Sequence, residues 1–122
     1  MKRIVLLSVV CAVLVAAAAA GAARRAAPPV GPLPSGPVTT IQTHKGEQVA
    51  VALPTRGGGR VWRVARAFDA RVLEQVSEGD VRGSVVLVFR AKGKGDTTLA
   101  FGLTLGERPK AFEARRYTVH VR

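Results

Sequence analysis

Residues 53–64 have the sequence Leu-Pro-Thr-Arg-Gly-Gly-Gly-Arg-Val-Trp-Arg-Val, and this stretch decides how the chain folds. Pro54 fixes φ and cannot donate a ladder hydrogen bond, so a strand that precedes it should end there. The glycines at 57–59 allow positive φ and favour a loop. Trp62, the only tryptophan, lies in the segment that follows. The stretch predicts two strands joined by a basic loop, with Trp62 as the structural core anchor. A plain hairpin loop with no partner is the alternative.

Short strands with a period of two extend on both sides of this loop. Val49, Val51 and Leu53 alternate with small alanines, which predicts one buried face. Residues 71–76 fit a strand or a helical turn, and their β-branched side chains favour the strand. Residues 84–90 are almost all apolar, which is typical of a strand buried on both faces. The expected strands are 38–41, 48–53, 61–66, 71–76, 84–90, 97–105 and 116–121, with 77–83 and 106–114 among the loops.

Seven short strands with turn signals at regular intervals predict an all-β fold. The spacing favours an immunoglobulin-like β-sandwich, here without the cysteine pair of immunoglobulin domains. The 122 residues are enough for one domain. Because the loops of a sandwich gather at its two ends, a functional site should lie at one of these ends.

The N-terminal residues have the pattern of an export signal. Lys2 and Arg3 precede an apolar run that fades into small residues, so residues 1–23 predict a cleaved signal peptide. The run is also nearly long enough to be an uncleaved membrane anchor. Cys11 lacks the small residue that precedes a lipidated cysteine. We therefore expect an exported protein, periplasmic or extracellular, with a Pro/Ala-rich linker at 24–37 and a folded domain at 38–122.

The chain is strongly basic. Nineteen Lys and Arg against eight Asp and Glu give a net charge of +11, and cleavage after Ala23 leaves 17 against 8, a net charge of +9. This charge bears on solubility and on attraction to polyanions, with an affinity that falls as salt rises. It does not bear on the fold.

The residue types argue against an enzyme and against a cofactor or metal site. Ser77 and Ser84 lack a recognisable partner base, because His44 and His120 lie outside any catalytic motif. Two histidines with scattered carboxylates do not give metal-ligand spacing. The glycines at 57–59 lack the strand-to-helix context and the Lys-Ser/Thr of a phosphate loop.

The order of these segments resembles the chagasin-type inhibitors of papain-like cysteine peptidases. The resemblance runs from Thr43 to Val121 and is carried by the stretches 45–54, 72–73, 89–91, 95–99 and 117–121, with Gly83 and the Gly59-to-Trp62 spacing. It implies an immunoglobulin-like sandwich whose three loops at one end enter the peptidase cleft. We expect the protein to be a monomer.

The three loops implied by the resemblance keep little of the family's usual sequence. The usual Asn-Pro-Thr-Thr and Tyr of the first loop are replaced, the second loop keeps only its last glycine, and the third lacks its Trp. The partner-binding residues are then Thr55, Arg56, Gly57, Gly58, Gly59 and Arg60 of the first loop, Arg82 and Gly83 of the second, and Leu105, Gly106, Glu107, Arg108, Pro109 and Lys110 of the third.

Two functions follow from these observations. The first is a divergent inhibitor of a papain-like cysteine peptidase that acts by loop insertion. The second is a non-inhibitory exported sandwich that binds an acidic protein or an anionic envelope polymer through its basic loops. Both require residues 55–60, 80–83 and 105–110 to lie together at one end, and both require a buried Trp62.

Overall fold

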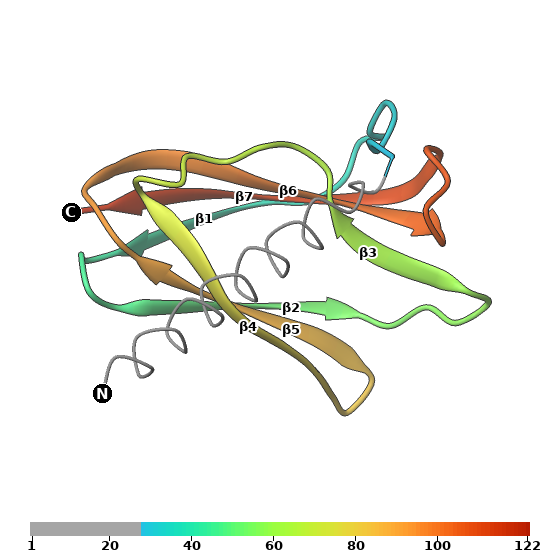
Figure 1. Cartoon of the computed structure of the whole chain (residues 1–122), viewed down its shortest axis with the longest axis horizontal. Helices are drawn as coiled ribbons and strands as arrows, with labels where there is room; N and C mark the ends of the chain where they lie inside the picture. The colour runs from blue at the N-terminus through green and yellow to red at the C-terminus, as the bar shows by residue number, and fades with distance from the viewer. Residues whose placement is uncertain (1–27) are drawn as a thin grey trace, which may run out of the picture.

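The computed structural model describes residues 28–122, in which seven β-strands form two sheets and no segment is helical. The strands are β1 (Val38–Thr43), β2 (Gln48–Pro54), β3 (Arg60–Val64), β4 (Leu73–Val81), β5 (Ser84–Ala91), β6 (Gly95–Leu105) and β7 (Ala111–Val121) (Figure 1). Within this range there is accordingly no helix of the length and hydropathy that crossing a membrane requires. The predicted signal peptide and Cys11 lie outside the described residues.

The two sheets pack face to face with a hydrophobic layer between them. One sheet has the order β1-β7-β6-β3 and the other β2-β5-β4, with all pairs antiparallel except β1 with β7 (Figure 1). The core is built from alternate residues of the facing strands, among them Leu53, Leu73, Phe89, Leu99, Phe101 and Val119. The all-β sandwich predicted from strand periodicity is thus confirmed, and β2 shows the expected alternation of buried and exposed residues.

Two segments that were predicted as loops are partly strand. β4 continues through Ser77 to Val81, so only Arg82 and Gly83 remain as the turn to β5. The prediction failed because β4 is an edge strand whose residues after Leu73 are all exposed, and polar residues are tolerated there. β7 begins at Ala111 rather than at 116, after a shift of register between Leu103 and Thr104.

The expectation that β5 is buried on both faces is also wrong. Leu87 and Phe89 are buried, whereas Val86 and Val88 on the other face are only half-buried. The four-stranded sheet covers the inner face of the three-stranded sheet, and no segment of residues 28–122 covers its outer face in the same way. The continuous apolar run therefore reflects a central strand with one packed face, and not a strand enclosed on both sides.

Trp62 packs against the core but is half-buried, where the sequence predicted a buried indole. Its strand β3 is the edge of the four-stranded sheet, so one side of the ring lacks a neighbouring strand. The indole Nε1 donates a hydrogen bond of 2.8 Å to the Pro54 carbonyl, and the Arg115 guanidinium lies 5.9 Å from the ring centre. Trp62 thus ties β3 to the end of β2 across the two sheets.

Residues 28–37, which fall within the predicted linker, form an extended strap against the outer face of the four-stranded sheet. Val30 is 7% exposed, and a Cβ added at Gly102 of β6 would lie 3.0 Å from the side chains of both Val30 and Leu33. Gly36 passes so close to β7 that an added Cβ would clash with the Ala114 carbonyl oxygen. The absence of side chains at Gly36 and Gly102 therefore lets the strap lie on the sheet.

Replacing Trp62 tests its role as the tie between β2 and β3. We expect Trp62→Ala to lower the free energy of unfolding by about 2–4 kcal/mol, and Trp62→Phe by about 1 kcal/mol, because the latter loses mainly the hydrogen bond to Pro54. Val61→Ala, at an exposed position of the same strand, should cost less than about 0.5 kcal/mol. Denaturant unfolding measures all three. Equal losses for Trp62→Ala and Val61→Ala would contradict the assignment.

The docking of the strap depends on Gly36. We expect Gly36→Ala to force the strap off β7, because the new methyl group would meet backbone and not a movable side chain. Hydrogen exchange should then accelerate at the Gly31 amide, which donates to the Pro109 carbonyl at 2.7 Å. Gly79→Ala is the matched control, since its Cβ would meet nothing within 4 Å. Unchanged exchange at Gly31 in Gly36→Ala would show that the strap does not depend on this approach.

Candidate functional site

Three loops that are distant in sequence lie at the same end of the sandwich, and the β2–β3 loop lies between the other two (Figure 1). The Thr55 amide at its start donates to the Gly83 carbonyl of the β4–β5 turn at 2.9 Å. At its other end, the Gly59 carbonyl accepts from the Gly106 amide of the β6–β7 loop at 3.2 Å. We call this set of three loops, residues 55–60, 80–83 and 105–110, the loop end. Of the second range only Arg82 and Gly83 form a turn, since Asp80 and Val81 belong to β4.

Left-handed backbone shapes two of these loops. Gly57, Gly58 and Gly59 have φ of 61°, 69° and 79°, a run that other residues resist. Arg82 and Gly83 have φ of 46° and 81°, as in the two-residue turns that match the twist of a hairpin. A Cβ added at Gly57 or Gly58 would meet nothing within 4 Å. The glycines at these two positions therefore serve the backbone conformation and leave a bare, exposed main chain.

Arg56 connects the first loop to β7 through a bidentate ion pair with Glu113. Its Nε donates to Glu113 Oε2 at 2.9 Å and its Nη2 to Oε1 at 3.0 Å. The hydrogen bond with Arg56 holds the pKa of Glu113 below its usual value. This stabilisation is therefore present above the ordinary pKa of a glutamate and is lost as the pH falls through the lowered value. Arg56 thus positions its loop, and its charge is paired.

Arg63 positions the third loop from the outer face of the four-stranded sheet. Its Nε donates to Thr104 Oγ1 at 3.0 Å, its Nη2 to the Arg108 carbonyl at 2.9 Å and its Nη1 to the Pro28 carbonyl of the strap at 2.6 Å. The Thr104 hydroxyl, fully buried, donates in turn to the Gly106 carbonyl at 2.7 Å. The sequence analysis did not predict this network.

Phe112 adds an aromatic ring beside the loop end that the sequence analysis did not identify. It lies between Ala111 and Glu113, where the register with β6 shifts. The Arg60 guanidinium carbon lies 4.2 Å and the Lys110 ammonium nitrogen 5.1 Å from the ring centre, both within cation–π range. The sequence predicted 106–114 as a loop, and a loop prediction does not place Phe112 beside Arg60 of β3.

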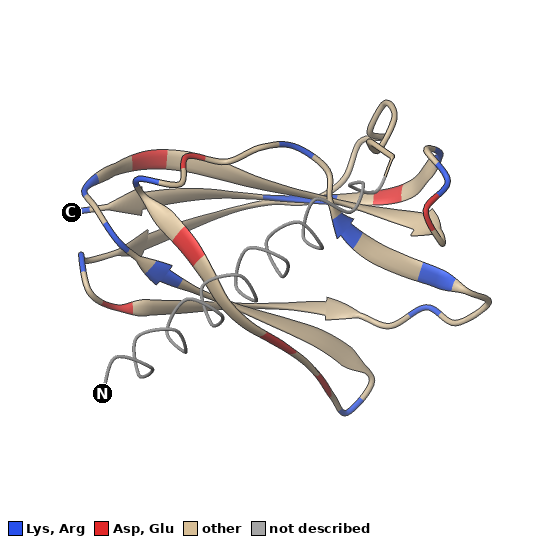
Figure 2. Cartoon of the chain, in the orientation of Figure 1, with Lys and Arg blue, Asp and Glu red and all other residues tan. Residues whose placement is uncertain are grey.

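Positive charge dominates the loop end. Arg60, Arg82, Arg108 and Lys110 lie in or beside the three loops, and none of them forms an ion pair within residues 28–122 (Figure 2). Glu107 is exposed on the third loop and Asp80 on β4 close to the second turn. We call the four cations Arg60, Arg82, Arg108 and Lys110 the basic rim. Arg56, which the sequence analysis counted with them, is neutralised by Glu113.

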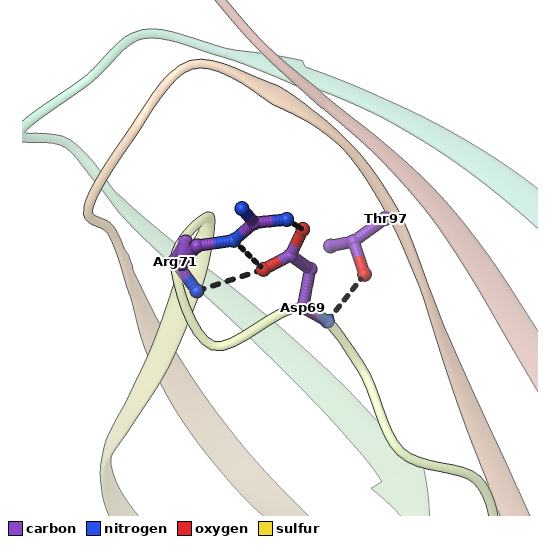
Figure 3. Close-up of polar contacts among 3 residues, drawn as sticks. All are labelled: Asp69, Arg71 and Thr97. Atoms are coloured by element: carbon purple, nitrogen blue, oxygen red, sulfur yellow. Dashed lines mark hydrogen bonds and ion pairs between the residues drawn. The ribbon is translucent and has the colours of Figure 1, made fainter.

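The opposite end of the sandwich contains local polar contacts that stabilise turns. Asp69 accepts from the Arg71 side chain at 3.1 and 3.2 Å and from its amide at 2.9 Å, while the Asp69 amide donates to Thr97 Oγ1 at 2.9 Å (Figure 3). The hydrogen bond from Arg71 holds the pKa of Asp69 below its usual value. His120 lies 2.8 Å from Asp96. Among residues 28–122 no three His, Cys, Asp or Glu side chains are grouped as metal ligands would be.

All the candidate loop residues thus fall in one region, with Trp62 beside it. Trp62 contacts the start of the first loop through Pro54. Leu105 is half-buried beneath Gly59, whose added Cβ would lie 3.5 Å from Leu105 Cδ1. Pro109 is bound to the strap through the Gly31 amide.

Comparison with known proteins supports the fold. No family model and no curated protein matches the sequence. Among solved structures, the chain is similar to the cysteine protease inhibitor EhICP2 from Entamoeba histolytica, with a TM-score of 0.56 and 12% identity over 73% of this chain and 99% of that one. The solution structure of amebosin aligns with a TM-score of 0.45 and 17% identity over 73% of this chain and all of that one. The similarity to the inhibitor confirms the chagasin-like, immunoglobulin-like sandwich that the sequence resemblance implied.

Proposed function

We propose that this protein is an exported inhibitor of a papain-like cysteine peptidase, and that its loop end enters the active-site cleft. The observation that carries the proposal is the joining of three loops on a chagasin-like sandwich. Hydrogen bonds from Thr55 to Gly83 and from Gly106 to Gly59 hold the three loops as one surface. Because these bonds are present in the free chain, little ordering would be required on binding.

The exposed glycines and the aromatic ring at the loop end are suited to insertion into a cleft. The bare main chain at Gly57 and Gly58 can approach a surface closely, since a glycine has no side chain to exclude it. Phe112 supplies an aromatic ring beside Lys110 of the third loop, the loop in which the resemblance implies a tryptophan. The ring is half-buried beneath Arg60 and Lys110, so a partner that neutralises these cations would complete its burial.

The basic rim selects among partners. Four cations without ion pairs within the described range would raise the rate of encounter with an acidic cleft and repel a basic one. The expected target is therefore a papain-like peptidase with a negatively charged cleft entrance.

The same rim supports a second candidate function, the binding of an anionic envelope polymer or an acidic protein without inhibition. Polyanion binding of this kind depends on the number of cations and not on loop shape, and it weakens steeply as salt rises. The elution of the chain from heparin distinguishes it from inhibition. Elution at a salt concentration near the physiological one would show that the positive charge has no specific role in binding. Elution only at a much higher salt concentration, together with a lack of inhibition, would favour the second function.

Titration of the full chain against several papain-like peptidases, ranked by the charge of their cleft entrance, tests the first proposal. We expect inhibition with a Ki at or below about 1 µM for the most acidic cleft. Arg108→Glu should weaken it about ten-fold or more, because the exposed Arg108 side chain belongs to the basic rim. Lys94→Glu makes a matched change of charge in the β5–β6 turn at the opposite end and should alter the Ki less than about two-fold.

Two outcomes would contradict the proposal. If no peptidase is slowed at high micromolar concentrations of the chain, the inhibitor function is wrong. If Lys94→Glu weakens inhibition as much as Arg108→Glu, net charge and not the loop end carries the interaction. Unfolding curves for both variants establish that each is as stable as the unmodified chain.

A further inference from the structure

A pocket of about 460 Å³ lies beside the strap on the outer face of the four-stranded sheet, away from the loop end. Its lining includes Leu33 of the strap, Arg66 and Ala67 after β3, Thr98 and Ala100 of β6, and Arg116 of β7. From these residues we propose that the pocket binds a small organic anion, a carboxylate or phosphate carried on a short apolar group. This inference does not depend on the inhibitor function.

Two guanidinium groups supply the anion-binding chemistry. Neither Arg66 nor Arg116 forms an ion pair with any carboxylate of residues 28–122, and no acidic side chain lines the pocket. Two like charges that share a pocket without a counter-charge repel one another, and an anion between them would relieve this repulsion. Arginine is suited to the task, since its planar fork matches carboxylate and phosphate oxygens.

The strap fixes both guanidiniums without neutralising them. Arg66 donates from Nη1 to the Val30 carbonyl at 3.2 Å and from Nη2 to the Gly31 carbonyl at 3.1 Å, with a third bond to its neighbour Ala65. Arg116 donates from Nη1 to the Pro34 carbonyl at 3.3 Å. A guanidinium has five N–H donors, so donors of both residues remain without a partner in the described chain. Carbonyl contacts hold the cations in place and leave their charge for a ligand.

The remaining lining residues define the rest of the ligand. Thr98 adjoins buried Leu99 on β6 and therefore faces outward, where its hydroxyl can donate to an oxyanion. Leu33, Ala67 and Ala100 form an apolar wall, and the two alanines leave room that a larger side chain would fill. A free inorganic ion would leave this wall in contact with water. The expected ligand is thus amphiphilic, with the charged group between Arg66 and Arg116.

Titration of the isotope-labelled full chain in a neutral detergent, followed by NMR at fixed ionic strength, tests the site. The probes are hexanoate, hexyl phosphate, inorganic phosphate and uncharged hexanol. We expect hexanoate or hexyl phosphate to shift the amide signals of Thr98, Ala100 and Arg116 in a saturable manner, and hexanol to leave them unchanged. The response to hexanoate against that to hexyl phosphate identifies which head group is preferred, and either one supports the proposal.

Variants separate the pocket from the general charge of the chain. Arg66→Gln and Arg116→Gln should each raise the dissociation constant about ten-fold or more, and Thr98→Val, which disturbs no contact of the strap, about three-fold or more. Lys92→Gln is the matched control: it removes one cation from an exposed side chain that neither lines the pocket nor contacts the strap, so the dissociation constant should change less than about two-fold.

Three results would overturn the proposal. The first is the absence of saturable shifts with any of the anions up to about 10 mM. The second is an affinity that is unaffected by Arg66→Gln, Arg116→Gln and Thr98→Val. The third is evidence of nonspecific attraction to a cationic protein: either shifts spread over the basic rim and the pocket alike, or equal binding of inorganic phosphate and hexyl phosphate.

Discussion

The Arg63 side chain connects the parts of the molecule on which the loop end depends. One guanidinium donates to the Thr104 hydroxyl, to the Arg108 carbonyl of the third loop and to the Pro28 carbonyl of the strap. A half-buried cation is stable here because its donors meet three oxygens, which offset the loss of water. Without it, Thr104, the strap and the third loop would each lose a partner. Arg63 therefore helps to set the position of the third loop from a neighbouring strand, together with the backbone hydrogen bonds from Gly106 to Gly59 and from Gly31 to Pro109.

The strap extends this dependence to the N-terminal side of the domain. Three arginines, Arg63, Arg66 and Arg116, donate to the carbonyl groups of the strap. The prolines of the strap have no backbone N–H, so they cannot donate hydrogen bonds to these carbonyl groups. The strap covers Gly102 and reaches Pro109, so it shields one part of the sheet and bounds the pocket beside it. The excess of arginine thus has a structural component as well as an electrostatic one. Net charge alone does not distinguish the two.

The sandwich was predictable because its signals are local. Period-two alternation in β2 and at the end of β7, the turn glycines and Pro54 indicate strands and their ends without reference to other segments. The loop end was predictable only through the family resemblance, since no local signal brings residues 55–60 next to 105–110. The resemblance also named the loops but not what holds them together.

The features that were missed depend on neighbours that are distant in sequence. Trp62 is half-buried because β3 is the edge strand of the four-stranded sheet. The polar half of β4 can be a strand because β4 is the exposed edge of the three-stranded sheet. Phe112 contacts Arg60 only because β3 and β7 flank β6. The pairing of Arg56 with Glu113 joins residues 57 positions apart. The contact between the strap and the sheet was likewise not predicted, because the proline-rich composition of the strap is typical of linkers.

The central claim is that the loop end forms one contact surface for a papain-like peptidase. Hydrogen exchange of the full chain, alone and with a peptidase whose catalytic cysteine is blocked, tests it most directly. The account predicts protection of amides in 55–60, 82–83 and 105–110 together, with no change at the opposite end in 44–47 and 92–94. Protection confined to the opposite end, or to only one of the three loops, would contradict it.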